Sequence, residues 1–484
     1  MEVRYSSATG RWILAATVLG SGMASIDATV VGIALPSIGR ELHSSLSLLQ
    51  WVVSGYLVTL AALLLPAGAL GDQLGRRLTF NVGVVWFTVT SAVCALAPNA
   101  TVLVFMRVLQ GVGAALLTPG SLAIIEASFD EESRGRAIGA WSGLGGVATA
   151  IGPLLGGYLI AAASWRWIFV INLPIGVAVL LLSSRHVPES KDEEAPDRID
   201  VRGSLLAVTS LVGLTYALIQ GPASGWLKPG VIGLLLIGVA SSVAFFLVER
   251  SEPNPMLPLS VFKVRQFTVT NAVTFVVYAA LGGALFLFPV ELQVVDHYTP
   301  LQSGVSLLPL TVIMLLLSAR SGKLASRIGP RLQMSVGPVV VAAGLALLRR
   351  ATTDSWYPTA VLPAVLVFGL GLAITVAPLT STAMNSLSAG HAGLASAVNN
   401  DVARLGSLIA VAVLPAIAGI RGSGYLHPAA LASGFRTATT VAAVTCLAGG
   451  LLAAAGISND AQPRRAEESR TYCALDGTPL ARRA

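Results

Sequence analysis

The sequence contains few charged residues. They make up 11% of the chain, against about 25% in typical soluble domains. Hydrophobic residues make up 54%, and the mean hydropathy is +0.75. A chain with so little charge cannot cover a folded surface in water, which excludes a soluble globular protein. Lipid is therefore the expected solvent for most of the molecule.

Several kinds of site are missing from the sequence. Three cysteines imply no disulfide framework, because Cys94 and Cys446 lie in apolar runs and Cys473 lies in a polar tail. The five histidines lack the spacing of metal ligands, and no phosphate-binding G-x-x-x-x-G-K-[ST] loop occurs. Catalytic residues do not cluster anywhere. We therefore expect no metal, no cofactor and no enzymatic activity, and we exclude ATP as the energy source.

The net charge of +7 does not indicate a nucleic-acid partner, because the basic residues are scattered in short loops. Positive residues in short loops are retained on the cytoplasmic side of a membrane. With a cytoplasmic N-terminus, loop residues such as Arg134, Arg136, Arg198 and Arg202 all fall on that side. The chain is thus predicted to be a multi-pass protein of the bacterial cytoplasmic (inner) membrane, with both termini in the cytoplasm.

Apolar runs of roughly 18 to 25 residues recur along the chain, and each could cross a hydrocarbon core about 30 Å thick as a helix. The predicted fold class is all-α integral membrane with about 14 transmembrane helices. Twelve spans remain an alternative, because leaving out the two runs between 203 and 248 would not reorient any later loop. The predicted spans lie near residues 12–35, 47–70, 79–97, 101–124, 137–160, 166–184, 203–221, 229–248, 267–290, 303–324, 333–349, 358–384, 399–419 and 431–456.

One loop motif occurs twice. The loop after the second run reads GALGDQLGRR (68–77), and the loop after the tenth reads SGKLASRIGPR (321–331). The repeat predicts a duplicated six-helix bundle with a substrate site near the midplane between the halves. The predicted parts are an N-terminal six-helix bundle (1–190), a linker with two extra helices (191–266), a C-terminal six-helix bundle (267–456) and a disordered cytoplasmic tail (457–484).

Four further motifs accompany the repeat: DATVVGIALP (27–36), LVFMRVLQGVGAA (103–115), IGPLLGGY (151–158) and SWRWIFVINLPIG (164–176). In this order and spacing they resemble the major facilitator superfamily, and within it the fourteen-helix drug:proton antiporter branch. The resemblance implies a major facilitator fold, two six-helix bundles plus two extra helices. It also implies export of small amphipathic drugs or antibiotics by alternating access, driven by a proton gradient. A monomer in the lipid bilayer is expected, with the substrate and protons as partners. Ser326 departs from the pattern, since the first copy of the loop has Asp72 at that place.

Asp27 is the candidate proton carrier. It lies inside the first run, where an ionised carboxylate costs at least about 2.5 kcal/mol unless it faces a cavity or finds a partner. Arg107 lies at a similar depth, roughly 9 Å from the outer end of its helix against roughly 12 Å for Asp27. We hypothesise that Arg107 holds Asp27 ionised in one state, and that protonation or a cationic substrate releases it in another. The resemblance also associates this pair with proton coupling; the alternative is a static buried ion pair.

Gly152, Pro153, Gly156 and Gly157 give the fifth span a small face that permits close helix contact. Packing alone would account for this face. The resemblance adds that a Gly-Pro pair followed by paired glycines marks exporters. The alternative function, a proton-coupled importer of a small nutrient or metabolite, is disfavoured by this motif.

Asp72, Arg76 and Arg77 stand at the cytoplasmic end of the second span. They are predicted to form an inner gate in which Asp72 caps a helix or pairs across helices, although positive-inside anchoring would suffice for the two arginines. Asp401 and Arg404, three residues apart at the start of the thirteenth span, are expected to form a local pair.

An apolar cavity with few polar groups suits an amphipathic substrate. The candidates are polar and aromatic residues of the second, fifth, sixth and ninth spans, although aromatics near headgroups also anchor helices. Glu291, the only acid of the ninth span, is either an interfacial residue or an accessory cation site. The sequence does not identify the substrate itself. The candidate residues are Gln50, Trp51, Tyr56, Trp141, Asn172, Tyr278, Phe286, Gln293 and Glu291.

Overall fold

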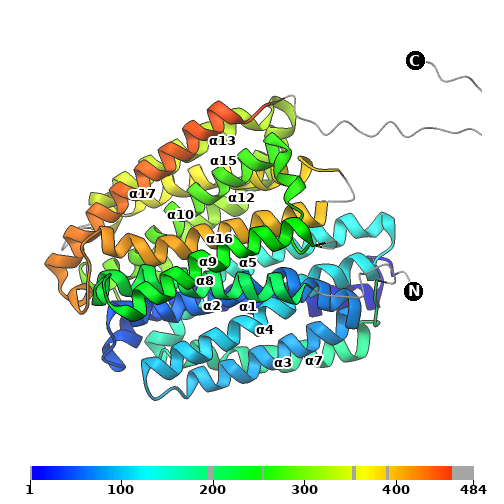
Figure 1. The fold of residues 1–484 in the computed structure, drawn as a ribbon, viewed down its shortest axis with the longest axis horizontal. Coiled ribbons are helices and arrows are strands. Elements are labelled where there is room, and N and C mark those ends of the chain that lie inside the picture. Colours follow the sequence, from blue (N-terminus) through cyan, green and yellow to red (C-terminus); the bar gives the residue numbers. More distant parts are fainter. Residues whose placement is uncertain (1–2, 193–199, 253–254, 351–355, 389–391, 460–484) are drawn as a thin grey trace, which may run out of the picture.

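The computed structural model describes residues 3–192, 200–252, 255–350, 356–388 and 392–459. Within these ranges fourteen spans are long and apolar enough to cross a membrane, which confirms the predicted number. The fold of this described part is all-helical, with two six-helix bundles and two extra helices (Figure 1). Residues 460–484 of the expected tail and residues 193–199 of the linker lie outside the described residues.

Side-chain caps fix where several helices of the first half begin. Ser7, Ser45, Asn99 and Asp130 each accept a hydrogen bond from a backbone N–H of the first turn that follows. Hydrogen bonds from Ser133 lower the pKa of Asp130 below its usual range, so this cap is a carboxylate at neutral pH. The elements are α1 (Ala8–Glu41), α2 (Leu46–Leu74), α3 (Arg76–Ala95), α4 (Ala100–Ser128), α5 (Glu131–Ala162), α6 (Trp167–Val170) and α7 (Asn172–His186).

The remaining helices form the extra pair and the second half. Three of the spans in the second half are split or extended by a short turn, as α6 and α7 split the sixth span. The elements are α8 (Val201–Ser224), α9 (Pro229–Ser251), η1 (Leu259–Lys263), α10 (Arg265–Val294), α11 (Pro300–Ser306), α12 (Leu308–Ile328), α13 (Pro330–Leu347), η2 (Leu348–Arg350), α14 (Tyr357–Ala360), α15 (Leu362–Asn385), α16 (Ala392–Ile417), η4 (Gly424–Leu426) and α17 (Pro428–Gly456).

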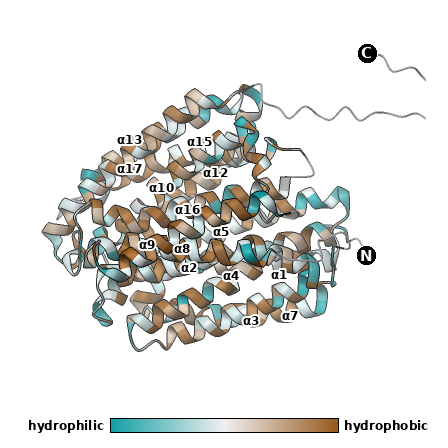
Figure 2. Cartoon of the chain, in the orientation of Figure 1, coloured by the Kyte–Doolittle hydropathy of each residue, from teal (hydrophilic) through white to brown (hydrophobic). Residues whose placement is uncertain are grey.

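Consecutive spans run in opposite directions, so the start of α1 and the end of α17 lie on the same side of the molecule (Figure 1). We call this side the terminal face. The opposite side, where α1 ends and α2 begins, is the distal face. Hydrophobic residues predominate along the spans, and hydrophilic residues gather toward the helix ends (Figure 2).

Glycines allow the helices of each half to approach closely. A Cβ atom at Gly113 of α4 would lie 2.7 Å from the backbone of Phe87 in α3. In the second half, a Cβ atom at Gly344 of α13 would lie 2.6 Å from the backbone of Phe368 in α15. Lipid tails are as apolar as leucine, so the association of membrane helices depends on such close packing rather than on the hydrophobic effect.

The two extra helices pack against each other, and α8 packs against both halves. Gly213 of α8 and Gly238 of α9 lie at their crossing, where neither position has room for a Cβ atom. α8 also contacts α2 of the first half and α16 of the second. On the α2 side, the rings of Trp51 and Tyr216 lie 6.2 Å apart. The extra pair therefore lies across the seam between the halves.

The repeated loops have the same backbone conformation and the same arginine contact in both halves. Gly75 (φ 128°) and Gly329 (φ 85°) adopt positive φ values that side chains rarely allow. The residues two positions later, Arg77 and Arg331, donate to backbone carbonyls further along the chain, those of Val187 and Ala454. The duplication detected in the sequence is thus present in the structure.

The start of the thirteenth span was predicted too late. α16 begins at Ala392 rather than near residue 399, because a polar stretch that lowers the hydropathy is nevertheless helical. Asp401 therefore lies well inside a span. No ion pair between Asp401 and Arg404 is found in the described residues, and Oδ1 of Asp401 is buried without a hydrogen-bond partner. Asp401 and Arg404 therefore form no direct ion pair in this conformation, although the charge of Arg404 still acts on Asp401.

We expect Gly344→Leu to destabilise the protein by about 1–3 kcal/mol, since the new side chain overlaps the backbone of Phe368. Gly233→Leu in α9 is the matched control, because no atom lies within 4 Å of a Cβ atom at that position. The free energy of unfolding, measured by denaturant titration in mixed micelles, separates the two variants. Equal losses would show that the α13–α15 contact does not depend on close backbone approach.

Candidate functional site

The centre of the first half is built around the carboxylate of Asp27. Asp27 is fully buried on α1, and Arg107 of α4 forms an ion pair with its Oδ2 through Nη1. Its Oδ1 accepts hydrogen bonds from Nε2 of Gln110 at 3.1 Å and from Nδ2 of Asn172 at 3.2 Å. Two helices, α4 and α7, thus supply the donors that compensate a carboxylate removed from water.

Arg107 is held in place on several sides. Its Nη1 donates to Oε1 of Gln110 at 2.7 Å, and its Nε donates to the carbonyl of Val52 in α2 at 3.1 Å. The guanidinium also lies over the ring of Tyr56, 4.3 Å from the centroid. A buried arginine with these contacts stays charged and well ordered. The ion pair therefore ties α1, α2 and α4 together.

Sequence reasoning found Asp27 and Arg107 but missed Gln110. Gln110 lies one helical turn after Arg107 in the motif LVFMRVLQGVGAA, so its spacing was the available signal. Asn172 was predicted to contact the substrate. In this conformation it bridges Asp27 and the hydroxyl of Ser91, to which it donates at 3.0 Å.

Two predicted substrate residues join the two halves at the distal face. Gln50 of α2 donates to the carbonyls of Val411 and Ala412 in α16, at 2.7 and 3.1 Å. Gln293 of α10 donates to the carbonyl of Ile33 in α1 at 2.9 Å. Both glutamines are buried, so neither is available to a ligand in this conformation.

Tyr425 adds a further contact between the halves at the distal face. Its hydroxyl donates to the carbonyl of Ser44 at 2.8 Å. Burial raises the pKa of Tyr425, so the hydroxyl keeps its proton throughout the physiological range.

The small face of α5 packs on both halves at the same end of the molecule. Gly152 and Gly156 lie against Thr29 and Val30 of α1, without space for a Cβ atom. On its other side, a Cβ atom at Gly157 would lie 2.9 Å from Cα of Leu301 in α11. Gly304 of α11 in turn lies against the backbone of Pro153. The predicted packing motif therefore lies at the contact that closes the distal face.

The predicted gate residues lie at the terminal face, within the first half. Asp72 forms an ion pair with Arg76 at 2.8 Å, one turn later in the chain. Arg77 pairs with Glu189 at 3.6 Å, and Glu189 also accepts hydrogen bonds from the backbone N–H groups of Arg77 and Leu78. Sequence reasoning missed Glu189, which is more than one hundred residues away along the chain.

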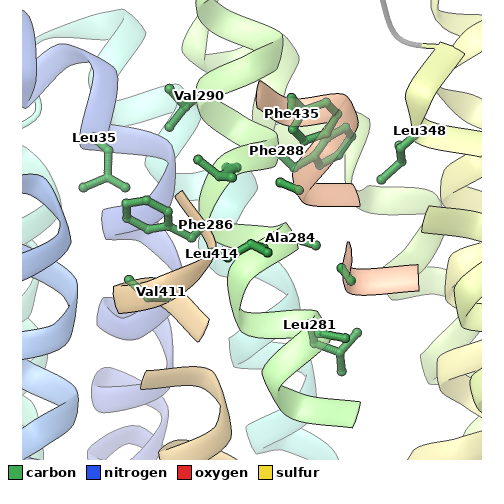
Figure 3. Close-up of a cluster of buried hydrophobic side chains, with 14 of the residues drawn as sticks. Leu35, Leu281, Ala284, Phe286, Phe288, Val290, Leu348, Val411, Leu414 and Phe435 are labelled. Atoms are coloured by element: carbon green, nitrogen blue, oxygen red, sulfur yellow. The ribbon is translucent and has the colours of Figure 1, made fainter. Parts of the chain in front are cut away.

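The other candidates are spread over the molecule. Trp141 of α5 donates to the hydroxyl of Ser21 on α1 at 2.9 Å. Trp51 faces the extra helix α8. Phe286 lies in the hydrophobic cluster between the halves (Figure 3), and Tyr278 packs against the same cluster. The structure therefore does not bring the nine substrate candidates together in one site.

Comparison with known families and proteins was made on the whole chain. The model of the "Major Facilitator Superfamily" matches residues 17–411. The tetracenomycin C resistance and export protein of Streptomyces glaucescens is 36% identical over 401 residues, covering 83% of this chain and 74% of that protein. The methylenomycin A resistance protein of Bacillus subtilis is 34% identical over 423 residues, covering 87% and 90%. The puromycin resistance protein of Streptomyces alboniger is 35% identical over 440 residues, covering 89% and 87%.

Solved structures support the same fold. A bacterial homologue of the human lysosomal transporter Spinster superposes with a TM-score of 0.66 at 16% identity, covering 93% of this chain and 97% of that one. A D-xylose–proton symporter superposes with a TM-score of 0.63 at 15% identity, covering 93% and 98%.

We expect Arg107→Gln to destabilise the protein by about 3–5 kcal/mol, because it leaves the carboxylate of Asp27 buried without its counter-ion. Asp27→Asn combined with Arg107→Gln should recover much of that loss, since no charge is then left uncompensated. A double-mutant cycle on the free energy of unfolding in micelles measures this coupling. Additive losses would mean that the two side chains do not stabilise each other.

Proposed function

The chain belongs to the Major Facilitator Superfamily, and from that premise we propose that it exports a small amphipathic drug or antibiotic in exchange for protons. It is a transporter rather than an enzyme. The names of its relatives, which include an export protein and resistance proteins for three antibiotics, support efflux as the direction. The observation that carries the proton coupling is the buried carboxylate of Asp27, balanced by Arg107.

In the proposed orientation the terminal face lies in the cytoplasm. The repeated loops at this face carry Arg76, Arg77, Arg327 and Arg331, and positive charge in short loops is retained on the cytoplasmic side. The distal face then faces the outside of the cytoplasmic membrane. Its contacts between α1 and α10, α2 and α16, and α5 and α11 would close the transporter to the outside.

In the proposed cycle the conformation described here follows the release of a proton from Asp27 to the cytoplasm. Its carboxylate then accepts from Arg107, Gln110 and Asn172. The cytoplasmic side is then open to load the substrate. Opening to the outside exposes Asp27 to a proton that replaces the substrate.

A physical connection runs from Asp27 to the distal contact of Gln50. Arg107 binds both Asp27 and the carbonyl of Val52, and Val52 lies two residues from Gln50 on α2. Protonation of Asp27 weakens its hydrogen bond to Arg107. This in turn weakens the contact that Arg107 makes with the carbonyl of Val52 in α2. Gln50, which joins α2 to α16, would then lose its position. In this way protonation favours separation of the halves at the distal face.

The coupling is tested with Asp27→Asn in inverted membrane vesicles energised by a proton gradient. We expect gradient-driven accumulation of tetracenomycin C, methylenomycin A or puromycin by the wild type, and accumulation at the level of vesicles without the protein for Asp27→Asn. The amide cannot release a proton, although it keeps the shape of the acid. Asp130→Asn is the control, because asparagine caps a helix as well as aspartate does. Undiminished pumping by Asp27→Asn would remove this residue from the mechanism.

The orientation is tested by labelling single cysteines in intact cells, in a variant in which Cys473 is replaced by serine. Cys94 and Cys446 are buried and remain in place. Leu227, 87% exposed at the distal face, should react as Leu227→Cys with a membrane-impermeant maleimide. Lys191→Cys, near the terminal face, should react only after the membrane is permeabilised. The reverse pattern would mean that the protein has the opposite orientation.

A further inference from the structure

Glu291 is a buried acid that the proposed cycle does not use. It lies near the distal end of α10 and has no exposed surface. Both of its carboxyl oxygens lack a hydrogen-bond partner in the described residues. Asp27 is equally buried in the same conformation but accepts from three side chains. The two acids therefore stand in opposite environments.

An ionised carboxylate without hydrogen-bond donors is very unfavourable away from water, and such a group takes up a proton instead. Two charged groups interact electrostatically with Glu291: Asp296, just beyond the end of α10, and Arg436 of α17. The side chain of Arg436 forms no ion pair with Glu291. In the described residues, no hydrogen bond or ion pair therefore compensates a negative charge on Glu291 in this conformation.

The position of Glu291 connects it to the closed distal face. Two residues later, Gln293 bonds to α1 of the other half. The segment after α10 folds back over its end: the N–H groups of Val295 and Asp296 donate to the carbonyl of Glu291, and that of Tyr298 donates to the carbonyl of Leu292. The chain then enters α11, which packs on α5. Separation of the halves at this face would thus move the segments on either side of Glu291.

The hydrophobic cluster around this part of α10 reinforces the connection. Val290 belongs to one cluster with Leu35 of α1, and Phe288 stacks on Phe435 of α17 with ring centroids 6.2 Å apart (Figure 3). Glu291 has no exposed surface while these side chains are packed. Any solvation of Glu291 therefore requires the distal end of α10 to lose contacts.

We propose that Glu291 is a second proton-binding carboxyl, located in the second half, and that it must hold a proton for the distal face to close. The proposal rests on the alternating access inferred above. The closed state binds one proton at Glu291, whereas a solvated glutamate has a pKa of about 4.3 and is ionised at neutral pH. Linkage then requires that protonation of Glu291 favours closure, in the sense opposite to protonation of Asp27. Where Asp27 cannot titrate, the ratio of closed to open molecules falls by up to about tenfold per pH unit as the pH rises.

The experiment measures closure of the distal face directly. Spin labels on Leu96→Cys and Thr359→Cys, exposed positions near the distal face in opposite halves, report the distance between the halves in lipid nanodiscs. The titration runs from about pH 5 to about pH 9, on both sides of neutrality. In Asp27→Asn, which removes the opposing titration of Asp27, we expect the short-distance population to fall as the pH rises. In Asp27→Asn combined with Glu291→Gln, a neutral isostere of the protonated acid, the short-distance population should stay high across the range.

Two further variants make the test specific. Glu249→Gln replaces another buried glutamate, which lies near the terminal face in the extra pair, and in the Asp27→Asn background it should leave the profile unchanged. If Glu291→Gln does not fold, Glu291→Met serves in its place, because it also carries no charge. A flat profile in Asp27→Asn, or a variant neutral at residue 291 that follows the same titration or stays open, overturns the proposal. Failure of Asp27→Asn to abolish pumping in vesicles would reject the proposed coupling and leave this distance measurement unaffected.

Discussion

The arrangement of the first half depends on one buried negative charge. Asp27 sits in the middle of a membrane helix, where an uncompensated carboxylate would be strongly unfavourable. Arg107, Gln110 and Asn172 compensate it from two other helices, and Arg107 extends the network to α2 through the carbonyl of Val52. Four helices are thereby fixed relative to each other by charge-assisted hydrogen bonds, which are roughly twice as strong as neutral ones. The first half is expected to move as a rigid body for this reason.

The contacts between the halves are of a weaker kind. Gln50, Gln293 and Tyr425 are neutral donors to backbone carbonyls, and a bond of this type contributes about 1 kcal/mol net. The glycines of α5 add close packing but no charge. Strong interactions within a half and weak ones between the halves suit the proposed alternating access, in which the halves separate and meet again. Each neutral bond exchanged for a bond to water on opening costs little.

Sequence reasoning was most successful where local pattern decides the outcome. The fourteen spans follow from runs of apolar residues, and the repeated loop follows from its glycines and arginines. It failed where residues far apart in the chain meet. Glu189 binds the loop at Arg77 across more than one hundred residues, and Gln50 meets α16 only after both halves have folded. The start of α16 was predicted too late because the polar residues before Asp401 were taken to lie outside the helix. In the structure these residues are helical, and Asp401 lies inside the span.

The two halves share a backbone plan but differ in the ion pairs and hydrogen bonds that their charged residues form. At the terminal face, Glu189 binds the loop N–H group of Arg77, and Asn459 takes the same role at Arg331. Asp72 pairs with Arg76, whereas its counterpart Ser326 bonds only within its own helix. Within the membrane, Asp27 is fully partnered, while Glu291 and Oδ1 of Asp401 are buried without hydrogen bonds in the described residues. The first half therefore surrounds its buried acid with hydrogen-bond donors, whereas the second half buries two acids with carboxyl oxygens that accept no hydrogen bond in the described residues. The duplicated fold has kept its backbone plan in both halves, while the donors available to a buried acid differ between them.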